Sequence, residues 1–245
     1  MDLNSLNQKI LEDFKAGNFK ENFKDLIKIY KIKKNSDIAN KLGVIFIKLN
    51  KIKFAKFFFK NSIEENDKNY KPYYNLANLL KSTDIKLSEE YIDKALYIEK
   101  TSEALVLKAH LLINSYKYDE VIKLLEKLKT SESLYLMGVS CLSLGLEEKS
   151  KFYFEESLKH NNIYIDFLNL NTFPRVYRNT KDIHYFRKKF FKICNNILSR
   201  IEKKKFSEDE RINIINSKTN FFLSYHQKND LELNKNYQSL CKKIL

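Results

Sequence analysis

The sequence predicts an all-α protein built from repeated pairs of helices. Its 245 residues include only four glycines and two prolines, whereas strand-rich folds need many tight turns that use these residues. In addition, small and large side chains recur in the same order in successive units of about 34 residues. The scarcity of turn residues favours helices joined by short loops, and the recurrence indicates that the helices come in pairs.

The unit that begins at Ser36 shows the repeating order of side chains. Its positions 7, 8, 11, 20, 24 and 27 hold Leu42, Gly43, Phe46, Ala55, Phe59 and Ser62. Small residues at positions 8, 20 and 27 let two antiparallel helices approach closely, and large residues at the other positions fill the space around them. The pattern therefore predicts that Gly43 lies where the two helices cross.

Further units repeat the same register along the chain. They begin at Tyr70, Ser102 and Ser131, and a weaker one covers residues 3–35. Position 8 holds Gly43 and Gly138, and position 15 holds Gly17 and Gly145. Every glycine thus stands where the motif needs a small residue or a left-handed residue that ends a helix. Unrelated amphipathic helices, the alternative, would scatter the glycines.

This pattern resembles the tetratricopeptide repeat and covers about two thirds of the chain. The resemblance implies a right-handed superhelix, an α–α solenoid, with about five repeats in residues 1–164. A helical linker or capping segment would follow in residues 165–245. The proline that usually ends each unit is missing, and Asp67, Lys100 and Asn162 stand in its place.

In the family that these units resemble, certain first-helix positions line a concave groove. The resemblance therefore implies a partner-binding groove of amides, tyrosines and a few charges. We expect it to contain Asn40, Lys48, Lys71, Tyr74, Asn75, Asn78, Lys81, His110, Asn114 and Tyr135. Such a lining suits an extended peptide, whose backbone needs donors and acceptors along its length. We therefore expect a noncatalytic module that binds a protein or peptide; alternatively, these are merely tolerated surface residues.

After Asn162 the repeat register ends. We expect residues 163–179 to be irregular, because Pro174 breaks any helix nearby. Asp182 can cap a helix that runs to about Ile201 and has an apolar stripe at spacings of three and four. Ser207 with Glu210 forms a predicted capping box, and Asp230 would cap the last helix.

The helix from residue 182 is unusually basic. The chain has a net charge of +14, and residues 181–205 hold nine basic and two acidic side chains. Its predicted basic patch consists of Arg187, Lys188, Lys192 and Arg200. Such a patch could neutralise phosphates, but no nucleic-acid recognition motif accompanies it and Lys is also the default solvent-facing residue in this chain. We therefore favour peptide recognition over nucleic-acid binding.

Two stretches of the tail resemble a second family. "VYRNTKDIHYFRKKF" and "NFFLSYHQKNDLELNKNYQSL" are similar to the segment that follows the repeats in bacterial glycosyltransferases of the O-GlcNAc transferase and Spindly type. The matching signature residues are Asn220, Phe221, Phe222, Leu223, Tyr225, Asn229 and Asp230. The resemblance implies a coupling piece next to a catalytic part, so a second interpretation is the substrate-recognition part of such a glycosyltransferase.

The sequence favours no chemistry within this chain. No glycine follows Gly145, so the tail has no Gly-rich phosphate loop, and the nucleotide-sugar-binding lobes of the resembling family would lie beyond residue 245. Ser224, His226 and Asp230 lie near one another in the sequence but lack an oxyanion-hole candidate. No pair of histidines has metal-ligand spacing, and the three cysteines form no CxxC pair. We expect no enzyme, metal or cofactor in this chain, and leave open that the full gene product transfers sugar.

The sequence also bears on location. No stretch approaches 18 uninterrupted apolar residues, and the start "MDLNSLNQKILEDF" lacks the basic flank and apolar block of a secretory signal. We therefore expect a cytoplasmic protein that does not act on membranes.

Overall fold

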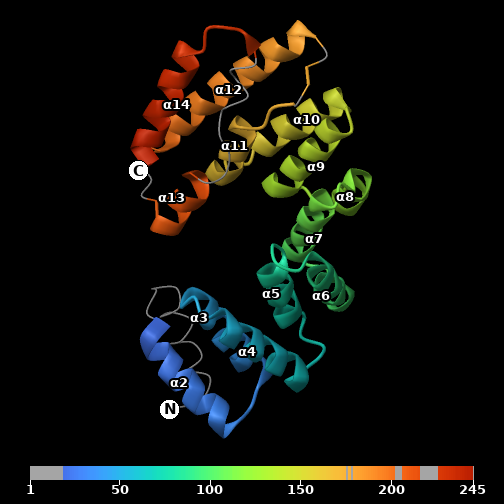
Figure 1. The fold of residues 1–245 in the computed structure, drawn as a ribbon, viewed down its shortest axis with the longest axis vertical. Helices are drawn as coiled ribbons and strands as arrows, with labels where there is room; N and C mark the ends of the chain where they lie inside the picture. The colour runs from blue at the N-terminus through green and yellow to red at the C-terminus, as the bar shows by residue number, and fades with distance from the viewer. Residues whose placement is uncertain (1–18, 175, 178, 202–205, 216–225, 245) are drawn as a thin grey trace. The chain divides into compact units, whose positions relative to one another are not determined.

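A computed structural model describes residues 19–174, 176–177, 179–201, 206–215 and 226–244. Within these ranges every regular element is an α-helix (Figure 1), which confirms the predicted all-α class and the α–α solenoid. The helices are α2 (Phe19–Ile32), α3 (Ser36–Lys48), α4 (Ile52–Glu65), α5 (Tyr70–Leu80), α6 (Ile85–Ile98), α7 (Ser102–Asn114), α8 (Tyr118–Leu125), α9 (Ser131–Ser143), α10 (Glu147–Leu158), α11 (Ile163–Leu170), α12 (Thr180–Ile201), α13 (Glu208–Ile215) and α14 (Leu231–Ile244). None of the described helices is long and apolar enough to cross a bilayer.

The chain divides into two compact units, Met1–Leu111 and Leu112–Leu245. In unit 1, α3 packs against α4 and α5 packs against α6, while α9 packs against α10 in unit 2 (Figure 1). Consecutive helices therefore form pairs, as the repeating register predicts. The weak first repeat, including Gly17, lies mostly outside the described residues.

Glycine at position 8 makes the close helix crossing possible. A Cβ atom placed on Gly43 would lie 2.4 Å from Cε1 of Phe59, and one placed on Gly138 would lie 2.6 Å from Cδ1 of Phe154. Both phenylalanines are fully buried at position 24 of their repeats. The ring of the second helix thus occupies the space that a larger residue at position 8 would need.

Position 15 has a left-handed backbone in three repeats. The φ angles are 54° at Asn50, 60° at Tyr116 and 72° at Gly145. In each case the next N–H reaches back to the carbonyl of position 11, at 2.8 Å from Lys51 to Phe46 and 2.8 Å from Leu146 to Cys141. This is the hydrogen bond of a left-handed helix end. The repeat therefore imposes this conformation even where the residue is not glycine.

Small serines at positions 20 and 27 also hydrogen-bond across the helix pairs. Ser88 Oγ donates to the carbonyl of Ala77 at 2.7 Å, and Ser62 Oγ donates to the carbonyl of Ser36 at 2.7 Å. Both serines are fully buried. Ser62 and Ser88 are therefore small enough for close packing, and each has its polar atom satisfied.

The tail contains more regular structure than the sequence predicted. Residues 163–170, expected to be irregular, form α11, whose first turn is capped because Asn162 Oδ1 accepts from the Ile165 N–H at 3.3 Å. Pro174 lies beyond the end of this helix and does not disturb it. Asn169 then donates to Ser157 Oγ at 2.8 Å, which ties α11 to the preceding repeat.

The start of α12 also differs from its prediction. The helix begins at Thr180, and Asn179 rather than Asp182 supplies the cap, accepting from the Asp182 N–H at 3.1 Å. Asp182 is buried instead and lies 3.3 Å from Lys151 Nζ. The predicted capping box is confirmed, since Glu210 Oε2 accepts from the Ser207 N–H at 2.9 Å and Ser207 Oγ accepts from the Glu210 N–H at 3.2 Å.

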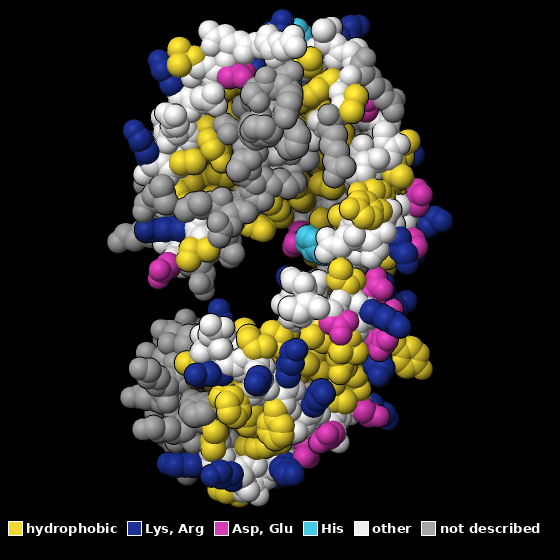
Figure 2. Space-filling view, viewed as in Figure 1, with side chains coloured by type: hydrophobic (Ala, Val, Ile, Leu, Met, Phe, Trp, Pro, Cys, Tyr) yellow, Lys and Arg dark blue, Asp and Glu magenta, His cyan; other side chains and the backbone are white. Residues whose placement is uncertain are grey.

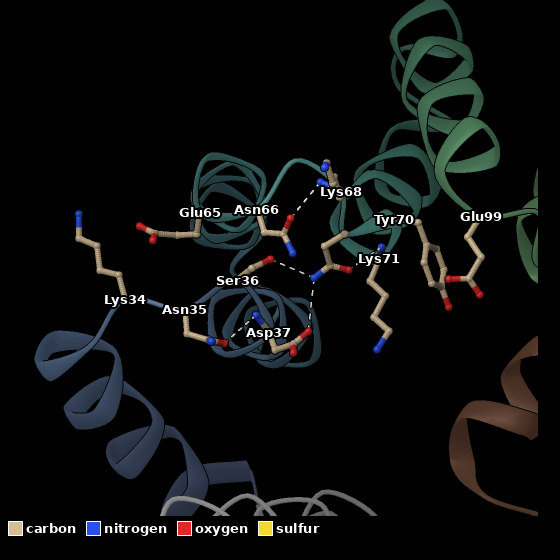
Figure 3. Close-up of a pocket in the computed structure, with 11 residues that line it drawn as sticks. Lys34, Asn35, Ser36, Asp37, Glu65, Asn66, Lys68, Tyr70, Lys71 and Glu99 are labelled. Atoms are coloured by element: carbon tan, nitrogen blue, oxygen red, sulfur yellow. Dashed lines mark hydrogen bonds between the residues drawn. The ribbon is translucent and has the colours of Figure 1, made fainter.

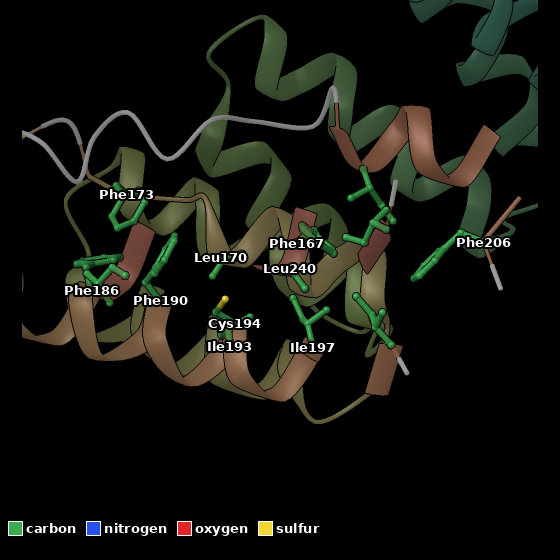
Figure 4. Packing of buried hydrophobic residues seen from close by; sticks show 14 residues of the cluster. Phe167, Leu170, Phe173, Phe186, Phe190, Ile193, Cys194, Ile197, Phe206 and Leu240 are labelled. Atoms are coloured by element: carbon green, nitrogen blue, oxygen red, sulfur yellow. The ribbon is translucent and has the colours of Figure 1, made fainter. Parts of the chain in front are cut away.

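The core of unit 2 joins the last repeat to the tail (Figure 4). The apolar stripe predicted for α12 faces α11 and α14. The buried residues of the whole core cluster are Phe167, Leu170, Phe173, Phe186, Phe190, Ile193, Cys194, Ile197, Ile201, Phe206, Ile214, Leu233, Leu240 and Ile244. Cys194 is a free thiol in this cluster and behaves as a small apolar residue, as expected.

Candidate functional site

The predicted groove residues of unit 1 lie on neighbouring first helices. Asn75 Nδ2 on α5 donates to Asn40 Oδ1 on α3 at 2.8 Å. Asn40 is only 8% exposed, so this bond satisfies a nearly buried amide. The pair links two consecutive repeats and places the exposed positions of α3 and α5 on one surface.

That surface, which we call the α3–α5 surface, combines polar and apolar side chains. On this surface the predicted groove residues Lys48, Lys71, Asn78 and Lys81 are exposed, and Tyr74 and Asn75 are half-buried. His110 is half-buried on α7. Val44 and Ile47, which are partly buried, lie on α3 like Lys48. Figure 2 shows Lys and Arg side chains spread among hydrophobic ones over the visible face of unit 1.

The two remaining groove residues lie in unit 2. Asn114 is exposed, whereas Tyr135 is only 4% exposed and its hydroxyl lies 3.0 Å from Thr172 Oγ1. Thr172 follows α11, in the stretch that the sequence left irregular. The tail therefore covers a tyrosine that the repeat register alone assigns to an open groove.

A polar pocket of about 540 Å³ lies in unit 1, where α3 and α5 begin and α4 ends (Figure 3). Its asparagines serve as helix caps. Asn69 Oδ1 accepts from the Lys71 N–H at 3.1 Å, and its Nδ2 donates to Ser36 Oγ at 2.9 Å and to Asp37 Oδ1 at 3.3 Å. These capping bonds at the pocket therefore join one repeat to the next.

The predicted basic patch is partly used inside the fold. Arg187 bonds Asp230 and also donates to the Asn229 carbonyl at 2.6 Å, and Arg200 bonds the buried Asp166 of α11. Burial raises the pKa of Asp166, and the Arg200 guanidinium opposes that shift. Only Lys188 and Lys192 of the four predicted residues are exposed.

His226 belongs to a buried contact between the segment before α14 and the segment before α12. The histidine is 3% exposed, and its Nε2 is hydrogen-bonded to the Tyr177 hydroxyl. Burial lowers the pKa of His226, the Arg187 charge lowers it further, and Asp230 opposes the shift. The residue is therefore part of the packing of the tail. Among the described residues no group of three His, Cys, Asp or Glu could hold a metal ion.

The comparisons with known proteins agree with this geometry. The tetratricopeptide repeat family model matches residues 131–162, which comprise α9 and α10. This chain contains a tetratricopeptide repeat. A search of curated proteins finds no match.

Several solved structures are similar to the chain, and MamA and pilF are two of them. The crystal structure of MamA has a TM-score of 0.54 and 15% identity, over 66% of this chain and 95% of MamA. The structure of pilF from Pseudomonas aeruginosa has a TM-score of 0.63 and 14% identity, over 82% of this chain and 92% of pilF. At such identities the likeness shows the repeat fold alone.

These comparisons do not extend to the glycosyltransferase resemblance. The family match ends at residue 162, before the two resembling stretches begin. Of the signature residues, Asn229 and Asp230 are described, and residues 220–225 lie outside the described ranges.

Proposed function

We propose that this protein is a noncatalytic interaction module that binds an extended segment of a protein partner on the α3–α5 surface. The observation that carries this proposal is the hydrogen bond between Asn40 and Asn75, because it aligns two first helices as neighbours. Repeat proteins of this class typically present such surfaces to their partners.

The α3–α5 surface can satisfy a peptide backbone without rearranging. Asn78 is exposed on α5 and offers both a donor and an acceptor. Lys48 and Lys81 lie at the ends of the two helices and can pair with acidic side chains or a chain terminus, while Val44 and Ile47 offer apolar contact. Asn75 is less suitable as a contact, because its side-chain donor already serves Asn40.

A peptide-display selection followed by binding measurements tests the proposal. The whole chain is used to select peptides from a random library, and the dissociation constant of an enriched peptide is measured by calorimetry. Replacing Asn78→Ala and Lys81→Ala together should weaken binding about tenfold, because each lost polar contact contributes about 0.5–1 kcal/mol.

The matched control changes Glu90→Ala and Lys94→Ala, two exposed residues of α6. This variant should bind the peptide like the unmodified chain. Equal weakening by both variants, or no weakening by the first, would rule out the α3–α5 surface. Circular dichroism melting of both variants separates lost contacts from lost folding.

We also propose a second function for the tail, as a coupling piece between the repeats and a glycosyltransferase catalytic part. The supporting observation is that the two resembling stretches meet: Arg187 bonds Asp230 and Asn229, and the rings of Phe190 and Tyr237 lie 5.9 Å apart. Sequencing the gene beyond codon 245 tests this proposal. An in-frame α/β region there supports it, and an immediate stop codon counts against it.

A further inference from the structure

A cleft runs between α10 and α12 in unit 2, outside the predicted groove. It consists of two contiguous cavities of about 330 and 320 Å³. Both cavities are lined by Glu155 and Leu158 of α10 and by Lys192 and Ile193 of α12. We call this feature the α10–α12 cleft. The lining residues of α12 span Tyr185 to Asn196, which corresponds to about 16 Å along the helix.

The floor of the α10–α12 cleft is apolar and firmly packed. Phe154 and Ile193 are buried in it, and Leu158 is half-buried. The Lys189 ammonium lies 4.1 Å from the centre of the Phe154 ring, which adds a cation–π contact to the floor. A partner side chain such as Leu would find apolar contact here at Leu158, beside the Lys189 ammonium.

The rim of the cleft is basic. Its exposed lysines are Lys188 and Lys192 on α12 and Lys159 after α10, and Lys159 pairs with Glu156. The acidic residues of the lining are Glu155 and Asp166, and Asp166 is already compensated by Arg200. The electrostatic potential at the mouth of the cleft is therefore positive, and the floor beside it is apolar.

We propose that the α10–α12 cleft is a second docking site, which binds an acidic amphipathic helix of a protein partner. The length of the cleft suits about three helical turns. Apolar side chains at spacings of three and four would lie on Leu158 and Ile193, while glutamates or aspartates beside them would face Lys188 and Lys192. This site is independent of the α3–α5 surface, which lies in unit 1.

The chemistry of the lining favours an acidic helix over a nucleic acid. Single-stranded nucleic acids bind where exposed aromatic faces can stack on bases. Here Phe154 is fully buried beneath Lys189. Tyr185 lies at the edge of the cleft, where its hydroxyl donates a hydrogen bond to Glu155 Oε1 at 3.4 Å. The aliphatic side chain of the lining that is partly exposed is Leu158, which suits contact with leucine or isoleucine side chains.

Fluorescence anisotropy with a synthetic probe tests the proposal. The probe is a fluorescein-labelled helix of about 14 residues made of Glu and Leu, with Leu at spacings of three and four. The comparison ligands are a peptide of the same composition with the Leu residues moved off one face, and a single-stranded RNA of equal charge. We expect the amphipathic probe to bind the whole chain more tightly than either comparison ligand.

Reversing the charge of lysines on the rim tests whether the probe binds in the α10–α12 cleft. Lys188→Glu with Lys192→Glu should weaken binding of the probe at least tenfold. The matched control is Lys123→Glu with Lys127→Glu, which makes the same charge change at two exposed positions four residues apart in unit 2. This control should change binding less than threefold, because a general field effect decays within about a Debye length.

Three results would overturn the proposal. The two reversals could weaken the probe equally, which would indicate only a general charge effect. The rearranged peptide could bind as tightly as the probe, which would mean that the apolar floor takes no part. The RNA could bind more tightly and lose that binding on Lys188→Glu with Lys192→Glu, which would assign the cleft to nucleic acid.

Discussion

Phe59 and Phe154 occupy the same place in two repeats, each against a glycine of the paired helix. The glycines are needed here for space rather than for backbone freedom, since both lie inside helices. At position 15 the requirement is reversed, because the backbone is left-handed at Asn50, Tyr116 and Gly145 while space is available. A single residue type thus serves two separate physical needs in one repeat.

Replacing Gly138→Ala should lower the free energy of unfolding by about 1–3 kcal/mol, because the new methyl group overlaps the Phe154 ring. Urea titration followed by circular dichroism measures the change. In a Phe154→Leu background the same replacement should cost less, since the smaller side chain leaves room. Equal costs in the two backgrounds would mean that the ring is not the obstacle.

Replacing Tyr116→Gly should raise the free energy of unfolding by about 1 kcal/mol, because a non-glycine residue with a left-handed backbone is strained. Tyr116 is 74% exposed, so little packing is lost. The control is Tyr97→Gly, at a 93% exposed position inside α6, which should be destabilising by about 0.5–1 kcal/mol. A loss of stability in both variants would contradict the argument from the φ angle.

At the scale of elements, α12 holds the other helices of the tail together through both of its faces. Its apolar face contacts α11 and α14, and its arginines reach Asp166 on α11 and Asp230 before α14. The charges at Arg187 and Arg200 therefore stabilise the fold, and Lys188 and Lys192 of the predicted patch remain exposed to a partner. A basic helix in a sequence does not distinguish these two uses.

The His226 contact predicts a pH dependence of this packing. Because the pKa of His226 is lowered in the fold, the neutral form is favoured there. The contribution of neutral His226 to the free energy of unfolding is fully present above the pKa of histidine in the unfolded chain, about 6.5. This contribution is lost as the pH falls through the lowered pKa of the folded state. Urea unfolding between pH 7.5 and 5 should show stability that declines with acid, and His226→Gln should flatten that decline. An identical decline in the variant would exclude His226 as the cause.

At the scale of the whole molecule, each unit has its own apolar core. In unit 1, buried residues of α3 and α4 form one cluster together with Leu26 of α2 and Leu76 of α5, and other buried residues of α5 form a second cluster with those of α6 and α7. In unit 2 the cluster around α12 needs α14 to cover it, since Leu233, Leu240 and Ile244 complete it. A repeat array needs such a cap, because its last helix pair would otherwise expose an apolar face.

A chain that ends after Ile201 should therefore expose the apolar face of α12. Phe190, Cys194 and Ile197 are at most 1% exposed in the whole chain. The shortened chain should bind the dye ANS strongly and elute as aggregates on gel filtration. The control is the full chain with Arg187→Ala and Asp230→Ala, which loses the ion pair but keeps the apolar cover and should not gain dye binding. Dye binding equal to that of the full chain would show that α14 is dispensable.

The sequence by itself determined the repeat. Small residues at positions 8, 20 and 27 and large ones at position 24 are local requirements of a helix pair, so they are visible in a single unit and are confirmed at Gly43 and Gly138. The apolar stripes of α12 and α14 were predictable for the same reason, because helical periodicity marks a buried face whatever covers it.

Only the tertiary structure decided which polar side chains remain available to a partner. Asn75 bonds Asn40, Tyr135 lies beneath the tail, and Arg200 compensates Asp166. These partners are 34 to 37 residues away in the sequence, and no periodicity within one helix specifies them. The α10–α12 cleft has the same origin, since it arises where a helix of the last repeat meets a helix of the tail.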